Sequence, residues 1–269
     1  MSAEYDNRFS GIARLYGVKA LQFFSQAHVC VIGIGGVGSW AAETLARSGI
    51  GKITLIDMDD ICVTNTNRQI HALKDTIGKQ KIDVMAERIR AINPECIVNP
   101  IDDFITVDDV GLHISKDFDY VIDAIDSVRS KTALLAHCNR QKIKCITIGA
   151  AGGQIDPTQI QVLDLSRTNQ DPLAAKVRSD LRRLHNFSKN PTSRFGIECV
   201  FSTEQLIYPG TDGEVCSTKN FLDGATGMDC SSGFGSSTAV TASFGLIAAS
   251  RVLKKLAERE ARYRPEEAS

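Results

Sequence analysis

The run Val29-Cys30-Val31-Ile32-Gly33-Ile34-Gly35-Gly36-Val37-Gly38 carries the strongest fold signal in the chain. Its apolar stretch at 29–32 predicts a buried strand, and the glycines that follow open a segment with helical spacing at 37–48. Glycines at such a junction allow a tight turn and a close approach of the backbone to phosphate, which the helix N-terminus also favours. The run therefore predicts a nucleotide site lined by Gly33, Gly35, Gly36 and Gly38. The alternative is a glycine turn that binds no ligand.

Strand-like and helix-like segments alternate through the first half of the chain. Strands are expected at 29–32, 52–57, 96–98, 120–123 and 145–148, and helices at 37–48, 79–92, 107–114 and 131–140. Strands separated by helices indicate parallel βαβ units with helices on both faces of the sheet. Beyond residue 153 the alternation stops, and further strands are expected at 160–163 and 205–208. We expect an α/β fold with a mostly parallel, Rossmann-like sheet, extended by further strands, a basic insertion and a C-terminal apolar helix.

Charge and cysteine content exclude several classes of protein. Thirty-one Lys and Arg residues against 32 Asp and Glu residues give a net charge of −1, which excludes a uniformly basic nucleic-acid coat but permits a local basic patch. None of the eight cysteines forms a Cys-x-x-Cys pair, so neither a zinc knuckle nor a thioredoxin-type motif is present. The first residues lack the pattern of a secretory signal. These features predict a reduced, cytoplasmic protein.

The C-terminal region contains an uncharged segment at 230–250 that is long enough to cross a bilayer. It is rich in Ser and Thr and is interrupted by glycines, which favours a buried helix, packed on the sheet or on a partner subunit, over membrane association. The charged end at 251–267 is expected to form an exposed helical tail, and 211–229 a mobile loop.

Charged residues beyond the second strand favour ATP over NAD as the nucleotide. Asp57 ends that strand, where it can accept hydrogen bonds from ribose hydroxyls. Arg68 and Lys81 follow it, and an enzyme that cleaves ATP needs such cations because charge builds on the phosphates during transfer. Asp126 follows the fourth strand at the ligand-binding edge of the sheet, where a carboxylate can hold Mg²⁺.

Five short motifs together point to a known family. They are Gly-x-Gly-Gly-x-Gly (33–38), Leu-Ile-Asp-x-Asp (55–59), Thr-Asn-x-x-Arg-Gln (64–69), Gly-x-x-Lys (78–81) and Asp-x-x-Asp-Ser (123–127). This set resembles the adenylating domain of ubiquitin-activating-like enzymes, including those that activate molybdopterin and thiamine sulfur carriers. The resemblance implies a Rossmann-like ATP-binding domain that uses ATP and Mg²⁺. It assigns Gly36 to the phosphates, Asp57 and Asp59 to the nucleotide, Asn65, Arg68 and Lys81 to the phosphates, Asp126 to the metal and Ser127 to the adenosine side, with Arg68, Lys81 and Asp126 as catalytic residues.

Two departures from that family are visible. The sulfur-carrier branch bears paired Cys-x-x-Cys motifs, which this chain lacks. Gly11 stands where the family has an arginine that reaches the phosphate of the partner subunit in a dimer, and Arg8 or Arg14 is the candidate substitute. The resemblance implies a homodimer, and it leaves open a requirement for a monovalent cation, Na⁺ or K⁺.

Motifs in the second half narrow the resemblance. They are Gly-Gly-Gln-Ile-Asp-Pro-Thr-Gln-Ile (152–160), Gln-Asp-Pro-Leu-Ala (170–174), Cys-Val-Phe-Ser-Thr-Glu (199–204) and Asp-Cys-Ser-Ser-Gly-Phe-Gly (229–235). They resemble a bacterial family of tRNA threonylcarbamoyladenosine dehydratases. This implies ATP-dependent cyclising dehydration of N6-threonylcarbamoyladenosine beside the anticodon of tRNA, through an acyl-adenylate. It also implies an association with a cysteine desulfurase or a sulfur-acceptor protein.

The resemblance predicts one adenylating domain over 1–269, with a nucleotide-binding half at 8–150 and a substrate and dimer half at 151–269. The second half holds the basic insertion at about 166–198, whose cations are Lys176, Arg178, Arg182, Arg183, Lys189 and Arg194. We expect Arg178, Arg182 and Arg183 to contact tRNA phosphates, because a protein of net charge −1 must bind a polyanion locally. The alternative is a solvated helix face.

Two further functions remain open. One is adenylation of the C-terminus of a sulfur-carrier protein with a cysteine as acyl acceptor, for which Cys230, before an apolar helix, and Cys199 are the candidates. The simpler interpretation is that both are packed thiols. The other is a non-catalytic adenine-nucleotide-binding scaffold in sulfur traffic.

Overall fold

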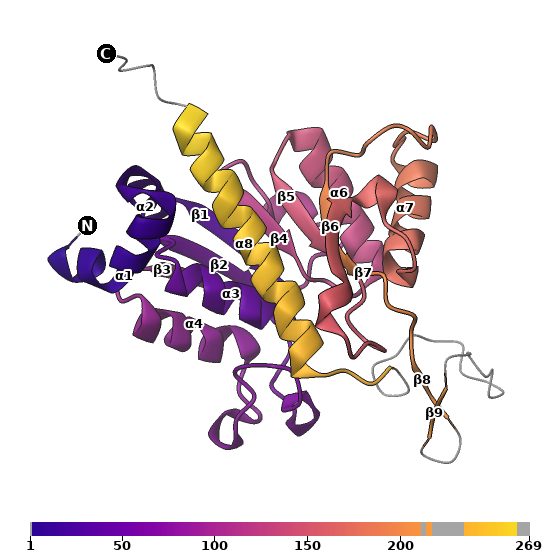
Figure 1. Cartoon of the computed structure of the whole chain (residues 1–269), viewed down its shortest axis with the longest axis horizontal. Coiled ribbons are helices and arrows are strands. Elements are labelled where there is room, and N and C mark those ends of the chain that lie inside the picture. The colour runs from indigo at the N-terminus through magenta and orange to yellow at the C-terminus, as the bar shows by residue number, and fades with distance from the viewer. Residues whose placement is uncertain (1, 211–213, 217–233, 263–269) are drawn as a thin grey trace.

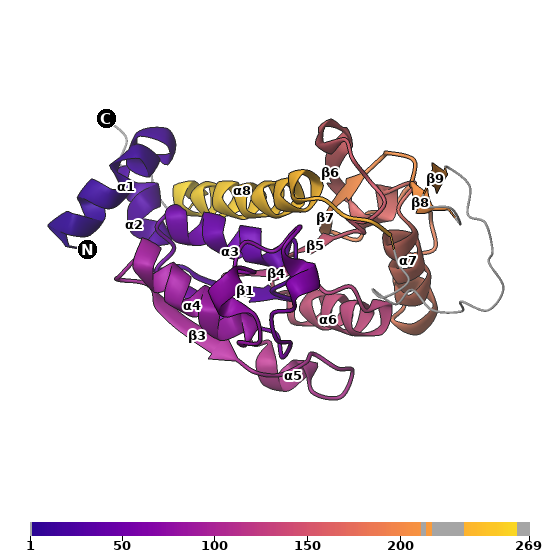
Figure 2. The ribbon, with the colours of Figure 1, turned by 90° about the horizontal axis from the view of Figure 1, so that it is seen from below.

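A seven-stranded sheet divides the protein into two helical layers (Figures 1 and 2). The computed structural model describes residues 2–210, 214–216 and 234–262. The strands are β1 (His28–Ile32), β2 (Lys52–Ile56), β3 (Ile97–Ile101), β4 (Tyr120–Asp123), β5 (Cys145–Ile148), β6 (Ile160–Asp164) and β7 (Glu198–Ser202). Their order is β3-β2-β1-β4-β5-β7-β6, and all neighbours are parallel except β6, which is antiparallel to β7. The expected mostly parallel α/β fold is confirmed.

The helices pack on both faces of this sheet. One face carries α2 (Val18–Phe24), α3 (Gly38–Arg47), α4 (Lys81–Ile92) and α8 (Thr238–Arg262). The other carries α5 (Val110–His113), α6 (Val128–Gln141) and α7 (Pro172–Leu184). In β1, Val29 and Val31 enter the first core while Cys30 and Ile32 enter the second. A strand buried on both sides is therefore apolar throughout, which is why 29–32 shows no alternation.

Smaller elements complete the chain. Helix α1 (Ala3–Tyr16) packs on α2 through a cluster of Tyr5, Phe9 and Leu21. The 3₁₀ turns are η1 (Val63–Asn65), η2 (Lys74–Thr76), η3 (Pro157–Gln159) and η4 (Leu165–Arg167). A short antiparallel pair joins β8 (Tyr208–Pro209) to β9 (Val215–Cys216).

The strand order places one crevice at the carboxyl edge of the sheet. From β1 the chain passes to α3 on the first face, and from the neighbouring β4 it passes to α6 on the second. Because the helices after these two adjacent strands pack on opposite faces, a crevice forms outside the strand ends. Open α/β proteins bind ligands in this crevice.

Some sequence-based boundaries are wrong. The strand expected at 205–208 is not part of the sheet, because β7 at Glu198–Ser202 occupies that place and only Tyr208 of the expected run lies in a strand. Burial explains the difference, since Cys199, Val200 and Phe201 are fully enclosed between the two helical layers. Helices α1 and α2 were not expected from the sequence.

The basic segment at 166–198 is a packed crossover and not an appendage. In chain order, helix α7 follows β6 and precedes β7. It buries four residues in the second core: Leu173, Ala174, Val177 and Leu181. These residues lie three and four positions apart and so share one helix face, which leaves the cations on the other. The expected insertion therefore contributes to the fold as well as presenting charge.

Helix α8 runs across the first face of the sheet beside α3 (Figures 1 and 2). The buried helix expected within 230–250 is confirmed from Thr238 onward. The segment expected as an exposed helical tail at 251–267 is helical as far as Arg262, as predicted, but it is not exposed throughout, because it continues α8 and buries Val252, Leu253 and Leu256. Across the described part of the chain, no helix combines the length and apolarity needed to span a membrane.

Candidate active site

The glycine turn after β1 is shaped by close backbone contacts. Gly33 has φ +83°, and a Cβ there would lie 2.8 Å from the carbonyl oxygen of Ala124 in the β4–α6 loop. A Cβ on Gly38 would lie 1.8 Å from the carbonyl oxygen of Gly33. Only glycine fits both positions, so the turn brings the first residue of α3 against the end of β4. The N-terminus of α3 therefore opens into the crevice between β1 and β4.

Asp57 stands directly after β2 at the same edge. Its Oδ2 accepts a hydrogen bond from the backbone N–H of Ile34 at 2.6 Å, and its Oδ1 accepts one from Asp59 at 2.9 Å. Burial raises the pKa of the Asp57 carboxyl above its ordinary value, and the nearby Lys81 ammonium opposes that shift. The carboxylate thus ties the second strand to the glycine turn, and each oxygen retains capacity for a further donor.

Arg68 lies against the glycine turn. A Cβ on Gly36 would meet its Cγ at 3.0 Å, so glycine is what lets this arginine cross the turn. Its guanidinium donates to the carbonyl oxygen of Thr64 and to Asn67, both at 2.9 Å. Asn65 is buried and its Oδ1 accepts the backbone N–H of Cys62 at 3.0 Å, which fixes the loop that carries Arg68. The structure therefore places Arg68, expected as a phosphate contact, against the glycine turn.

Lys81 begins α4 and is buried among carboxylates. Its Nζ lies 2.6 Å from Asp59 Oδ2 and 3.9 Å from Asp57 Oδ1. The Lys81 side chain therefore brings positive charge to the carboxylates of Asp59 and Asp57, close to the turn that Asp57 holds. Asp59, expected as a nucleotide contact, acts here as the ion-pair partner of Lys81.

Asp126 and Ser127 lie in the loop between β4 and α6. Both are exposed, and Ser127 caps α6 with its Oγ 3.5 Å from the backbone nitrogen of Ser130. Within the described residues, no group of three or more His, Cys, Asp or Glu side chains could hold a metal ion. A single exposed carboxylate beside a phosphate site nevertheless suits Mg²⁺, which commonly takes one or two carboxylates with phosphate and water oxygens.

Two buried polar side chains near this site were not singled out from the sequence. Gln69 is buried, lies beside Gly35, and its Oε1 has no hydrogen-bond partner among the described residues. Both ring nitrogens of buried His71 are likewise unpartnered within the described chain. Burial lowers the pKa of His71 to about 4, and the charges of Lys81 and Arg88 act in the same direction. Apolar patterning gives no signal for such residues, because burial here comes from loop packing.

The residues at the crevice fit a nucleoside triphosphate. The glycine turn forms a cradle that side chains would fill, the α3 N-terminus supplies backbone N–H groups, and Arg68 supplies charge. The buried Oε1 of Gln69, which has no hydrogen-bond partner among the described residues, could accept a hydrogen bond from a ligand. A purely structural turn would need none of these together.

Cys199, one of the two candidate thiols, lacks the exposure and the low pKa of a nucleophile. Cys199 is fully buried in β7, and burial raises its pKa well above the ordinary value. A protonated, enclosed thiol cannot reach an acyl-adenylate. Cys230 lies outside the described residues.

The three arginines of α7 are tied into their surroundings to different degrees. Arg178 is half-buried and donates to Thr168, while Arg182 donates to the carbonyl oxygen of Ser188 at 3.2 Å and lies 5.3 Å from the Phe195 ring centre. Arg183 is exposed and pairs with Asp180 at 2.8 Å. Arg183 is therefore the most available of the three, together with the exposed Lys176, Lys189 and Arg194.

An open α/β sheet with a glycine cradle, a following acidic residue and a facing arginine defines a nucleotide-binding protein of the adenylating class. The sequence pattern of the ThiF family matches residues 8–268. The chain is 61% identical, over 97% of its length and 98% of the relative's, to a tRNA threonylcarbamoyladenosine dehydratase of Escherichia coli K12. A dehydratase of the same name from Bacillus subtilis is 41% identical over 75% of this chain and 76% of its own.

Solved structures agree with these sequence matches. The E. coli dehydratase TcdA in complex with ATP superposes with a TM-score of 0.87 at 57% identity, covering 98% of this chain and 99% of that one. A structure of the same enzyme with AMP covers 97% and 98% with a TM-score of 0.86. The chain belongs to the ThiF family.

Proposed function

We propose that this protein is an ATP-dependent dehydratase that cyclises N6-threonylcarbamoyladenosine beside the anticodon of tRNA. The observation that carries the proposal is the meeting of the glycine cradle, Arg68 and the Asp126 loop at one crevice. The identity of 61% over nearly the whole chain to an enzyme named for this activity supports the choice of substrate.

The reaction proceeds in two steps. The threonyl carboxylate of the modified nucleoside attacks the α-phosphate of ATP, which forms an acyl-adenylate and releases pyrophosphate. The neighbouring ureido group then attacks the activated carbonyl and displaces AMP, which closes a ring with the net loss of water from the nucleoside. Both reacting groups of the second step belong to one molecule, so proximity supplies much of its rate and no protein nucleophile is required.

The side chains at the crevice have separate roles in this proposal. The glycine turn and Asn65 hold the phosphates, and Asp57 accepts from the ribose. Arg68 and Lys81 offset the charge that develops on the phosphates during transfer. Asp126 would hold Mg²⁺, which polarises phosphate oxygens when bound, and Ser127 lies toward the adenosine. The residues favour no particular monovalent cation.

Asp126→Ala tests the metal assignment. Asp126 is exposed at the end of a strand, so its loss should leave the fold intact while turnover of ATP with modified tRNA falls to background. The check is AMP release at saturating ATP over a range of Mg²⁺ concentrations. Near-wild-type turnover in this variant contradicts the assignment.

The exposed face of α7 is the proposed docking surface for tRNA. Phosphate contacts by Arg178, Arg182 and Arg183 would position the RNA, while the crevice recognises the modified base. The proposal includes a nucleotide-binding half at 8–150 and a substrate and dimer half at 151–269.

A homodimer forms part of the proposal. Within one chain Arg8 pairs with Glu4 at 2.6 Å and contacts the carbonyl oxygen of Ile92, at the opposite end of α4 from Lys81. Arg8 therefore lies away from Lys81 of its own chain, and in this proposal Arg8 or Arg14 reaches the phosphate site of a second copy. We place the protein in the cytoplasm, with a cysteine desulfurase or sulfur-acceptor protein as a further partner.

Activation of a sulfur-carrier protein is the second candidate, and a non-catalytic nucleotide-binding scaffold is the third. The carrier reaction would use one cysteine as acyl acceptor, and Cys199 is unsuited to that role because it is fully buried. ATP–pyrophosphate exchange separates the candidates. Stimulation by tRNA bearing the modified adenosine supports the dehydratase, stimulation by a carrier protein supports the second candidate, and exchange with neither leaves the scaffold.

A further inference from the structure

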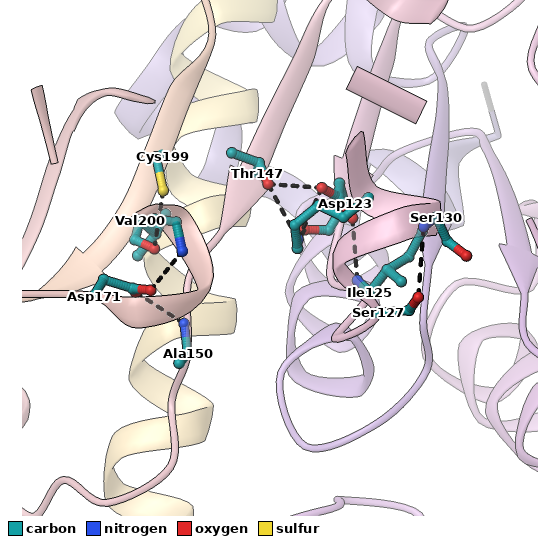
Figure 3. A network of polar contacts seen from close by, with 11 residues as sticks. Asp123, Ile125, Ser127, Ser130, Thr147, Ala150, Asp171, Cys199 and Val200 are labelled. Carbon is teal, nitrogen blue, oxygen red and sulfur yellow. Dashed lines mark hydrogen bonds and ion pairs between the residues drawn. The ribbon is translucent and has the colours of Figure 1, made fainter. Parts of the chain in front are cut away.

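A buried polar cluster adjoins the β4–α6 loop, and Figure 3 shows two of its members, Asp123 and Thr147, beside Ile125 and Ser127 of that loop. Its members are Asp123 at the end of β4, Lys131 in the first turns of α6 and Thr147 in β5. Their side chains are at most 2% exposed. Removing a lysine and an aspartate from water is costly, and apolar side chains of the same size fill such a space at no comparable cost. The cluster therefore calls for a function beyond packing.

The Asp123 carboxylate joins three elements. Asp123 and Thr147 are partners in the parallel register of β4 and β5, so their side chains point to the same face. Asp123 Oδ2 accepts from Thr147 Oγ1 at 2.6 Å and from Lys131 Nζ at 2.8 Å. Its other oxygen, Oδ1, accepts from the backbone N–H of Ile125 at 3.1 Å, inside the loop. Figure 3 shows Thr147 directed at Asp123, with Ile125 and Ser127 on the adjoining loop.

Two backbone hydrogen bonds, one at each end of the loop, also hold the loop in place. At its start, the N–H of Ala124 donates to the carbonyl oxygen of Ile32 at 2.9 Å. At its end, the carbonyl oxygen of Ser127 accepts from the backbone N–H of Lys131 at 2.9 Å. Asp126 thus lies between two neighbours whose backbone atoms are hydrogen-bonded, and the carboxylate of Asp123 is the buried side chain that anchors the first of them. Charge-assisted hydrogen bonds of this kind are the stronger ones in proteins.

We propose that Asp123, Lys131 and Thr147 are positioning residues that set the geometry of Asp126 at the phosphate site. Lys131 and Thr147 orient the Asp123 carboxylate, and that carboxylate holds the backbone of Ile125, next to Asp126. Because Ala124 also lies against Gly33, the same cluster keeps the Asp126 loop in register with the glycine cradle. The inference rests on the proposed role of Asp126 in binding Mg²⁺.

Thr147→Val is the mildest test, because it keeps the shape and removes one donor. We expect hydrogen exchange at the Ile125 amide to accelerate about 10-fold, the scale of one lost charge-assisted hydrogen bond. ATP affinity without Mg²⁺ should stay at the wild-type value, while the increase in affinity on adding Mg²⁺ should shrink. Thr147→Ser retains the hydroxyl, so Ile125 exchange and the Mg²⁺-dependent gain in ATP affinity should both be close to the wild-type values. Lys131→Met should change Ile125 exchange and the Mg²⁺ response more than Thr147→Val does. This comparison requires that the Lys131→Met protein has a wild-type circular dichroism spectrum.

Thr54→Val is the matched control, since Thr54 is also buried in the sheet and its hydroxyl also pairs, with His28 at 2.8 Å. It should change neither Ile125 exchange nor the Mg²⁺ response. Unaltered exchange at Ile125 in Thr147→Val overturns the positioning role. Asp126→Ala is measured alongside by calorimetry with ATP. If it keeps the full Mg²⁺ response, the metal assignment fails, and with it the link between the cluster and the metal. If it loses that response while Thr147→Val keeps it, the link alone fails.

Discussion

At the scale of single residues, the site depends on charges held close to a neutral backbone turn. Arg68 lies on Gly36, and Lys81 is buried against Asp59 and Asp57. Arg68 is not placed for stability alone, because a half-exposed arginine contributes little to folding. The positions of both cations suit stabilisation of charge that appears only as the phosphates rearrange.

Arg68→Ala and Lys81→Ala should therefore lower turnover more than ATP affinity. We expect losses of about 10²-fold in kcat, the scale for removing one preorganised donor, with a small change in the KM for ATP. Arg140→Ala makes the same charge change at an exposed position near the end of α6 and should leave both parameters unchanged. Steady-state AMP release with modified tRNA measures the effect. Wild-type kcat in both test variants would remove these residues from the mechanism.

His71 should make the folded state sensitive to mild acid. Its folded pKa of about 4 lies below the ordinary value of 6.5, so folding favours the neutral ring. The resulting stability is present above pH 6.5 and is lost as the pH falls toward 4. Between pH 7 and pH 5 this group should reduce the free energy of unfolding by about 2 kcal/mol. Urea denaturation of the wild type and His71→Phe at both pH values measures it, and an equal pH dependence in the two proteins would contradict the role of His71.

At the scale of elements, the site depends on the contact between α8 and α3. Gly245 in α8 faces the start of α3, where a Cβ would lie 2.4 Å from the carbonyl oxygen of Val37 and 2.9 Å from the nitrogen of Ala41. Two helices can approach this closely only where one presents no side chain. The C-terminal helix thereby supports the helix whose N-terminus faces the phosphates.

Gly245→Ala should destabilise the fold although alanine favours helix. The clash is with backbone atoms, which cannot rotate away, so we expect a net loss of about 1–3 kcal/mol in the free energy of unfolding and weaker ATP binding. Gly111→Ala in α5 is the control, since its Cβ would meet only His137 at 3.7 Å. Chemical denaturation and calorimetry with ATP give the two readouts. A stabilised Gly245→Ala protein would show that α3 and α8 adjust freely.

At the scale of the whole molecule, the chain is nearly neutral and its basic face is local. The net charge of −1 gives no general attraction to RNA, whereas α7 presents Lys176 and Arg183 outward and the segment after it presents Lys189. Arg178 and Arg182 also hold neighbouring residues in place, so replacing them mixes folding with binding. The exposed cations therefore give the cleaner test of the docking surface.

Lys176→Ala, Arg183→Ala and Lys189→Ala combined should weaken tRNA binding and reduce its dependence on salt. Each lost phosphate contact lowers the slope of log affinity against log salt by about 0.7–0.9. ATP affinity should not change. A control with Lys19→Ala, Lys144→Ala and Lys254→Ala makes the same charge change at exposed positions outside α7 and the segment that follows it. Filter binding at several salt concentrations compares the two proteins. Identical slopes would show that these cations do not contact tRNA.

The first five strands of the sheet and the glycine turn at the crevice were predictable from the sequence. The strands β1, β2, β4 and β5 are mostly apolar runs, the glycine turn and Asp57 follow strands directly, and Asp126 lies in the loop after β4, so local patterning and the geometry of βαβ units place them. Features decided by packing between distant segments were not readable in this way. The strand at Glu198–Ser202 took the place expected for 205–208, and the helical tail expected after residue 250 proved to be a continuation of α8 with one face buried. The tertiary structure alone decided that Cys199 is enclosed, that His71 is buried in a loop, and that Lys131 reaches Asp123 and Thr147. Those contacts join residues far apart in the chain, and neither periodicity nor motif spacing records which distant side chains will share one buried space.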